Sequence, residues 1–306
     1  MATRYLIDRQ LTLLADGQDA GALPCVSIVA ESEFDDAPFV APLYKNAMKS
    51  LISTENTYLD ACPDCFIGSV AMPDRTDPAN DPYRFAFFLD RKRLLLLDNG
   101  PLCADALATI ASSRPLHEVT TVYCLFELMR LLTKGDQKYL SDYEDAMERT
   151  EEAILGEELS DTSQVMLAYR RTLLKLDTYY RQLTDMADDA IDNENGLLTE
   201  GEVRLFEQQQ RACERLMDRV ATLREYSVQL RELHQSQIEA QRNSTMQLFT
   251  IITVLFVPLT LMTGWFGMNF THMPGLDEAW AYPAFVLAVA AIVVAEIVVF
   301  KRKGWL

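Results

Sequence analysis

The feature that most constrains this chain is a pair of long apolar runs near its C-terminus. No charged side chain occurs from Asn243 to Pro274. A second run, YPAFVLAVAAIVVAEIVVF, is interrupted only by Glu296. Each run is long enough to cross the roughly 30 Å hydrocarbon core of a bilayer as a helix. The sequence therefore predicts transmembrane helices at 246–267 and 282–300, since a soluble hairpin of such helices rarely stays in water.

The charges that flank these runs predict their orientation. Arg242 precedes the first run, and the short tail 301–306 begins with Lys301, Arg302 and Lys303. The intervening loop, 268–281, has no Lys or Arg, and its only charges are Asp277 and Glu278. Because basic residues stay on the cytosolic side, both termini are predicted to be cytosolic in a multi-pass protein of the cell (inner) membrane.

A long helix is predicted to lead into the first span. From Glu202 to Thr263 there is no glycine, and Pro258 is the only proline. Thr199 and Glu202 have the spacing of a capping box, which marks the start of a helix. The segment 199–245 is expected to be a stalk of bundle or coiled-coil type, because apolar residues recur at heptad-like steps. These residues are Leu216, Val220, Leu223, Leu230 and Leu233.

Residues 1–115 are predicted to form a cytosolic α/β domain with a mixed sheet. The runs PCVSIVAE, DCFIGSVAM, YRFAFFLD and RLLLLDNG are typical of strands bounded by turn residues. Segments 44–58 and 104–112 are predicted to be helical. The chain has neither a G-x-G-x-x-G nor a G-x-x-x-x-G-K-[ST] loop, so nothing indicates an ATP-driven machine.

Residues 116–198 are predicted to be an acidic helical region, with helices at 118–133, 137–155 and 162–191. Between Asp136 and Glu202 there are 18 acidic and 6 basic residues, net −12 of the chain's −17. Such a charge makes nucleic acid an unsuitable partner, since phosphate binding needs basic patches. The excess fits either a solvated surface or a region that collects divalent cations.

The cysteines do not predict a metal site or a catalytic site. Cys62 and Cys65 form a C-P-D-C motif, whose spacing suits a redox couple or half of a zinc site. No second C-x-x-C is present to complete a zinc site, so free thiols in a reducing cytosol are expected. No nucleophile–base pair or metal-ligand constellation appears, and the chain is not expected to be an enzyme.

The first span carries a polar stripe. Residues at helical steps of three and four along it include three threonines, and they are Met246, Thr250, Thr253, Val257, Thr260, Gly264 and Met268. Two spans cannot enclose an aqueous path, so a pore would require several subunits around an axis. Small and hydroxyl residues also mediate ordinary packing between membrane helices, and spacing alone leaves both readings open.

The tripeptide GMN closes the first span, after NSTMQLFT and VPLTLMTGWF and before MPGL. With the acidic NENGLLTEGE turn and the FKRKGWL ending, this half of the chain resembles the CorA family of magnesium channels. The resemblance implies a homopentameric funnel in which the stalk helix continues into a pore-lining span. It implies Mg²⁺ as both the transported and the regulatory ion, and no organic cofactor.

The resemblance also implies roles for individual residues. Gly267, Met268 and Asn269 would form the selectivity filter, with Asn269 outermost. The pore lining and gate would comprise Met246, Phe249, Thr253, Val257, Thr260 and Gly264. Two departures stand out: Phe266 replaces the usual hydroxylated aromatic, and Gly275 replaces a loop glutamate. Asp277 and Glu278 are expected to attract cations in its place.

Single residues bear on which ion is transported and on where a regulatory metal would bind. Met268 favours magnesium over a zinc transporter of the ZntB type, and Co²⁺ or Ni²⁺ passage fits a site that reads hydration. A membrane-anchored sensor that transports nothing is the alternative from another class. Glu296 is expected to reach the interface or a neighbouring subunit rather than to bind an ion. Regulatory metal is expected at the acids Asp185, Asp188, Asp189, Asp192 and Glu194.

Overall fold

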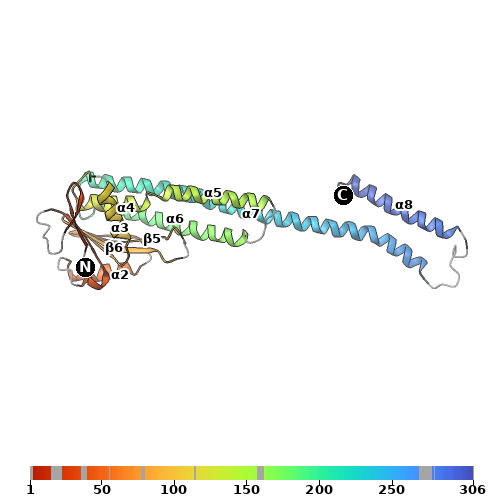
Figure 1. Ribbon diagram of the computed structural model, residues 1–306, viewed down its shortest axis with the longest axis horizontal. Helices are drawn as coiled ribbons and strands as arrows, with labels where there is room; N and C mark the ends of the chain where they lie inside the picture. Colours follow the sequence, from red (N-terminus) through yellow and green to blue (C-terminus); the bar gives the residue numbers. More distant parts are fainter. Residues whose placement is uncertain are drawn as a thin grey trace. The chain divides into compact units, whose positions relative to one another are not determined.

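The computed structural model describes residues 3–14, 23–35, 40–54, 56–76, 80–113, 115–156, 162–268, 278 and 280–305. The chain divides into two compact units, Met1–Arg231 and Glu232–Leu306. Helix α7 (Glu200–Phe266) begins in the first unit and ends in the second (Figure 1).

The first unit contains a mixed sheet, as predicted. Its strand order is β2-β1-β3-β7-β6-β5-β4, and β3 and β7 form the parallel pair while the other neighbours are antiparallel. The strands are β1 (Thr3–Ile7), β2 (Leu11–Leu13), β3 (Cys25–Val29), β4 (Tyr58–Cys62), β5 (Cys65–Met72), β6 (Tyr83–Leu89) and β7 (Arg93–Asp98). The four strands expected from apolar runs are confirmed. Strands β1, β2 and β4 were not predicted.

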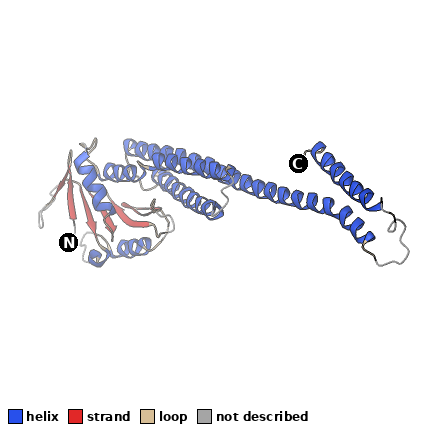
Figure 2. Ribbon diagram, turned by 45° about the vertical axis from the view of Figure 1, so that its right-hand side comes forward, coloured by secondary structure: helices blue, strands red, loops and turns tan. Residues whose placement is uncertain are grey.

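The central strands are buried on both faces, which explains their continuous apolar sequences. Alternate side chains such as Phe88 and Leu95 pack against Met48 of α2 (Pro42–Ile52). Their neighbours Phe87 and Leu96 point to the opposite face and are fully buried. Figure 2 shows the strands in red between α2 and the other helices. Short helix α1 (Glu31–Phe34) and helix α3 (Leu102–Ser113) complete the cover.

The helix expected over 44–58 is wrong at its C-terminal end. Helix α2 stops at Ile52, and Tyr58 already begins β4. The cause is tertiary: Gln182 of α6 (Thr162–Asp192) accepts a hydrogen bond from the Thr57 backbone N–H at 2.9 Å. The Thr57 hydroxyl in turn accepts one from the Ala71 N–H at 3.1 Å. These partners hold the segment in an extended form that no local pattern indicates.

The remaining helices agree with the predicted positions within a few residues. They are α4 (Thr121–Thr133), α5 (Asp136–Leu155), α6 (Thr162–Asp192) and α7. The predicted capping box at the start of α7 is confirmed, because Glu202 accepts from both the backbone N–H and the hydroxyl of Thr199 at 2.9 Å. Helices α5, α6 and the first part of α7 lie side by side (Figure 1). Arg219 of α7 forms an ion pair with Glu144 of α5.

The second unit is a helical hairpin made by the end of α7 and by α8 (Ala281–Arg302). The rings of Phe266 and Phe285 meet at one end of this hairpin. At the other end, the Gln247 side chain donates to the Trp305 carbonyl at 3.5 Å. Helix α8 includes the first two basic residues of the expected tail. Both α7 and α8 contain a stretch that is long and apolar enough to cross a membrane.

Candidate functional site

A shallow groove runs along the last turns of α7, inside the second unit. Its volume is about 640 Å³. Its lining residues are Thr253, Phe256, Val257, Thr260, Leu261, Gly264, Trp265 and Met268. Five of them belong to the stripe that the sequence analysis assigned to a pore, so the helix does bring those positions together.

The groove also contains side chains that the stripe did not include. Phe256, Leu261 and Trp265 stand one position away from stripe residues, and they widen the apolar part of the lining. A pattern of residues spaced by three and four positions does not include them, because it describes a single line along the helix surface. Met246 and Phe249 lie nearer the start of the span, outside the groove, and are 59% and 63% exposed.

The threonine hydroxyls in the span each donate a hydrogen bond to a backbone carbonyl of the preceding helical turn. Thr253 donates to the Phe249 carbonyl and Thr260 to the Phe256 carbonyl, each at 2.8 Å. A hydroxyl has one proton and two lone pairs, so donating to the helix leaves its oxygen as an acceptor. The polar atoms that these threonines present are therefore hydrogen-bond acceptors. Acceptors suit a cation surrounded by water molecules whose hydrogens point outward.

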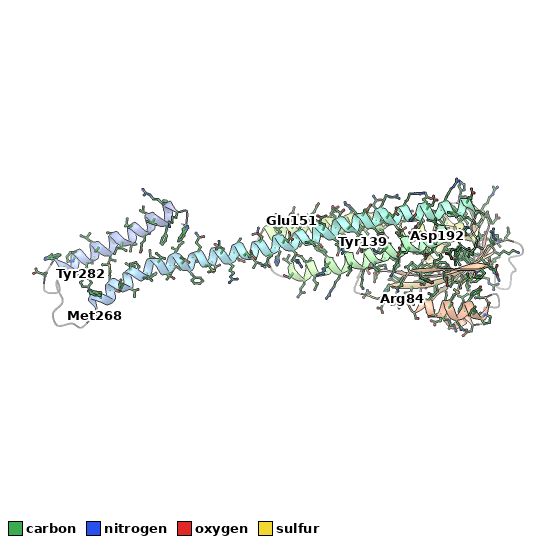
Figure 3. All side chains as sticks on the ribbon, turned by 180° about the vertical axis from the view of Figure 1, so that it is seen from behind. Arg84, Tyr139, Glu151, Asp192, Met268 and Tyr282 are labelled. Carbon is green, nitrogen blue, oxygen red and sulfur yellow. The ribbon has the colours of Figure 1, made fainter. Side chains whose placement is uncertain are left out.

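The helix backbone changes character near Pro258 and again at Gly267. Proline has no N–H, so the Val254 carbonyl lacks its usual partner four residues on. At the end of α7, the Gly267 N–H donates to the Thr263 carbonyl at 3.0 Å. A Cβ atom at Gly267 would lie only 3.0 Å from that same oxygen, so glycine permits a close approach here. Met268 follows the last residue of α7, and Figure 3 labels it at the same end of the hairpin as Tyr282 of α8.

Part of the predicted filter lies outside the described residues. Asn269 of the filter is one of these residues, as are Gly275 and Asp277 of the predicted loop, and their predicted roles stay predictions. Glu278 is described: it is exposed, and its carbonyl accepts from the Ala281 N–H at 3.0 Å just before α8. Its carboxylate therefore lies close to the first turn of the second apolar helix.

The acids proposed for regulation are exposed at the end of α6 and in the turn after it, where Figure 3 labels Asp192. Asp189 is exposed, but partial shielding of its carboxylate from water is the first cause that raises its pKa, and the neighbouring charges of Asp185, Asp192, Asp188 and Glu194 add to it. Gln210 of α7 donates to Asp188 at 2.5 Å, whereas the charge of Asp189 acts on Tyr58 of β4. The cluster thus faces two different neighbours, and the described residues contain no group of three or more potential ligands that converges on one metal position.

Glu296 lies within α8 and is half-buried. Its Oε2 atom is enclosed and has no hydrogen-bond partner among the residues that the structure describes. An enclosed carboxyl oxygen without a donor is costly in an apolar setting. A donor from outside these residues would relieve that cost.

The surface of the second unit is strongly apolar. Leu261 is 68% exposed, Trp265 62% and Leu287 71%, and almost none of either apolar stretch is buried within the chain. Apolar surface of this extent needs lipid or further copies of the chain to cover it. Together, the fold and the groove define a two-span membrane protein whose first span carries a line of hydroxyl acceptors.

The chain belongs to the family described as CorA-like Mg²⁺ transporter protein, whose model matches residues 48–302. A cobalt/magnesium transport protein CorA of Thermotoga maritima is 28% identical over 184 residues, which cover 60% of this chain and 52% of that protein. A magnesium transport protein CorA of Campylobacter jejuni is 41% identical over 71 residues, 23% of this chain and 22% of that protein. The chain thus spans about half, or less, of the length of these curated relatives.

Solved structures support the same fold. The complete CorA magnesium transporter of Methanocaldococcus jannaschii matches with a TM-score of 0.81 and 18% identity, covering 100% of this chain and 99% of that one. The cytoplasmic domain of ZntB from Vibrio parahaemolyticus matches with a TM-score of 0.59 and 10% identity, covering 78% and 98%. At such identities the likeness concerns the fold alone. It does not distinguish magnesium from zinc.

Proposed function

We propose that this protein is a channel for passive, potential-driven uptake of hydrated Mg²⁺, with Co²⁺ and Ni²⁺ as further permeant ions. The observation that carries the proposal is the groove of α7, where threonine oxygens are kept as acceptors on the last turns before the GMN tripeptide. Membership of the CorA-like family supports magnesium as the ion.

The chemistry of Mg²⁺ explains why such a lining suits it. The ion is small, prefers octahedral oxygen coordination and gives up its water reluctantly. A path that strips the ion would have to replace the whole hydration shell. A path of neutral acceptors instead binds the hydrogens of the ion's own water molecules. The Asn269 amide would be the outermost of these acceptors, and a neutral ring releases a divalent ion more readily than carboxylates would.

The driving force is the membrane potential. A divalent ion that crosses 100 mV gains about 4.6 kcal/mol. Uptake therefore needs no nucleotide, in keeping with a sequence that has no nucleotide-binding loop. In the proposed arrangement the α7–α8 hairpin crosses the inner membrane and both termini are cytosolic, which agrees with the basic residues that flank the two apolar stretches.

A homopentamer is the proposed assembly. One groove on one helix cannot surround an ion, and the exposed apolar face of the hairpin offers a surface for other copies and for lipid. Met246, Phe249 and Val257 would then form apolar rings, which close a path by dewetting. In such an assembly a neighbouring subunit would supply the donor that Glu296 needs.

Intracellular Mg²⁺ is the proposed gating signal. The acids at the end of α6 repel one another, and they do not converge on a metal within one chain. Ions shared between neighbouring subunits would offset this repulsion and hold the closed ring. Loss of the ions would let the subunits separate and wet the apolar rings.

The test is ion flux into liposomes that contain the purified protein, with Mg²⁺, Co²⁺, Ni²⁺ and Zn²⁺ compared under an imposed potential. Asn269→Ala should abolish Mg²⁺ flux, whereas Asn269→Gln, which keeps the amide, should retain part of it. Light scattering checks that both variants assemble. Zn²⁺ flux well above Mg²⁺ flux would support a ZntB-like transporter instead. Intact assemblies that pass none of the four ions would support a non-transporting sensor.

A further inference from the structure

The C-P-D-C motif lies at the tip of a β-hairpin that the proposed function does not use. Cys62 ends β4, Cys65 begins β5, and the two are direct partners in the strand register. Opposed residues in an antiparallel pair have Cα atoms about 4.5–5.5 Å apart. A disulfide needs about 4.4–6.8 Å. The backbone therefore already has the spacing that a disulfide requires, and Cys62 packs against the core cluster that contains Cys65.

The two sulfurs differ in access. Cys62 is half-buried, whereas Cys65 is buried in the core beside Tyr44 of α2. An external reagent therefore reaches Cys62 first, and Cys65 is placed to attack the Cys62 sulfur from within. Both thiols are free in this structure.

The surroundings of the two thiols disfavour the thiolate forms, so both cysteines should react slowly with disulfides. Burial, with help from the Asp60 charge, raises the pKa of the Cys62 thiol. Burial and the adjacent Cys62 raise the pKa of Cys65 to about 12. The motif lies on a hairpin and not at a helix N-terminus, where thiol pKa values are lowered. The pair is therefore suited to slow oxidation and reduction that follow the redox potential of its surroundings, and not to rapid catalytic thiol–disulfide exchange.

The backbone of the pair holds another part of the molecule. The Asn195 side-chain amide donates to the Cys62 carbonyl at 2.7 Å and to the Cys65 carbonyl at 3.1 Å. The Asn195 side-chain oxygen accepts from the Leu197 N–H at 3.0 Å. The turn between α6 and α7, residues 193–199, is thus docked on the peptide groups of the two cysteines.

We propose that Cys62 and Cys65 form a reversible intramolecular disulfide, and that its formation tightens the docking of the α6–α7 turn through Asn195. The oxidant is a low-molecular-weight disulfide, RSSR. The Cys62 thiolate attacks one sulfur of RSSR and releases RS⁻, which leaves a mixed disulfide. The Cys65 thiolate then attacks the Cys62 sulfur and releases the second RS⁻. Two protein thiols and one RSSR become one protein disulfide and two RSH, and excess RSH reverses both steps.

The effect on the turn follows from the geometry of the contact. A bond between the two sulfurs limits the separation of the strand ends that carry both acceptor carbonyls. Asn195 then loses its partners less often, and the turn opens less often. Hydrogen exchange of the Leu197 and Leu198 amides should slow, on the order of tenfold, in keeping with the entropy that a short closed loop removes. This inference goes beyond the proposed function and does not depend on it.

The experiment uses the full-length wild-type protein in detergent, equilibrated with defined mixtures of oxidised and reduced glutathione at mildly alkaline pH. Remaining thiols are then blocked with N-ethylmaleimide and peptides are analysed by mass spectrometry. The peptide that contains Cys62 and Cys65 should be lighter by two hydrogen atoms and carry no maleimide. After reduction with dithiothreitol and a second treatment with N-ethylmaleimide, it should carry two maleimides. A stable glutathione adduct on Cys62, or two alkylated thiols at every glutathione ratio, would overturn the proposal.

Matched variants and hydrogen exchange complete the test. Cys65→Ser should keep a glutathione adduct on Cys62, because no second sulfur can displace it. Cys25→Ser should leave the disulfide unchanged, since Cys25 of β3 pairs with Leu6 and Arg93 and not with a cysteine. In the oxidised wild type, exchange should slow in residues 193–199 and stay unchanged at Tyr123 in α4. Equal exchange at 193–199 in both redox states would refute the coupling.

Discussion

The ring of Phe266, the last residue of α7, meets the ring of Phe285 in α8 edge-on, with centroids 5.1 Å apart and an interplanar angle of 71°. The contact joins the two apolar helices on either side of the loop that carries Asn269. It is the kind of aromatic pair that adds about 0.5–1.5 kcal/mol beyond simple burial. It therefore fixes where α7 ends relative to α8 within the hairpin.

A double-mutant cycle measures this contact. Phe266→Ala and Phe285→Ala should each lower the free energy of unfolding in mixed micelles, and the double variant should lose less than the sum, by about 0.5–1.5 kcal/mol. Phe249→Ala with Phe285→Ala is the control, because Phe249 lies more than four helical turns before the contact and the two effects should add. Additive losses for Phe266 and Phe285 would show that the rings do not support each other.

The second prediction concerns the groove hydroxyls. Thr260→Val keeps the shape of the side chain and removes the acceptor, so Mg²⁺ flux should fall about fivefold if each ring position contributes about 1 kcal/mol through one hydrogen bond to water. Thr263→Val is the matched control: Thr263 makes the same bond to a carbonyl four residues back but does not line the groove. Equal losses in both variants would indicate an effect on the helix and not on the ion path.

The loop acids should act at long range. Asp277→Asn with Glu278→Gln should reduce Mg²⁺ uptake most at low ionic strength, because the screening length falls from about 30 Å at 0.01 M salt to about 8 Å at 0.15 M. The measurement is the initial rate of liposome uptake across a salt series. Glu225→Gln, an exposed acid of α7 outside the apolar span, is the control and should have no effect. A loss that is the same at every salt concentration would point to a structural role.

Stability should depend on pH at the end of α6. The pKa of Asp189 is raised in the folded protein, first by partial shielding of its carboxylate from water and then by the neighbouring acids. Between the ordinary aspartate pKa of about 3.9 and this higher value, the folded chain holds a proton that the unfolded chain has lost. Unfolding then releases a proton, so this residue's contribution to stability falls as the pH rises through that window.

Asp189→Asn should therefore stabilise the protein above the window and have little effect below it. At neutral pH without divalent ions the gain should be about 0.2–1 kcal/mol, the range for exposed charge interactions. Thermal unfolding of the full-length protein between pH 4 and pH 7 is the measurement, and Asp142→Asn on α5 is the control for loss of one surface charge. A gain that does not change with pH would contradict the assignment.

Local signals in the sequence were sufficient for much of the architecture. The two long apolar runs predict α8 and the end of α7, because length and apolarity alone decide whether a helix suits a bilayer. The absence of glycine predicts the long α7, and the Thr199–Glu202 spacing predicts its first turn. The apolar runs of β5, β6 and β7, bounded by turn residues, predict strands. Each of these features depends on neighbours a few residues apart.

Other features depended on residues far apart in the chain. The chain leaves the helix at Ile52 and enters β4 at Tyr58, earlier than expected, because Gln182, 125 residues away, holds the Thr57 backbone. Phe256, Leu261 and Trp265 line the groove because it covers a wider part of the helix surface than the single line of residues that the spacing predicts. Asn195 binds both cysteine carbonyls across 130 residues or more. Local patterns carry no record of such partners, because a hydrogen bond or a ring contact forms only where the folded chain brings its two groups together.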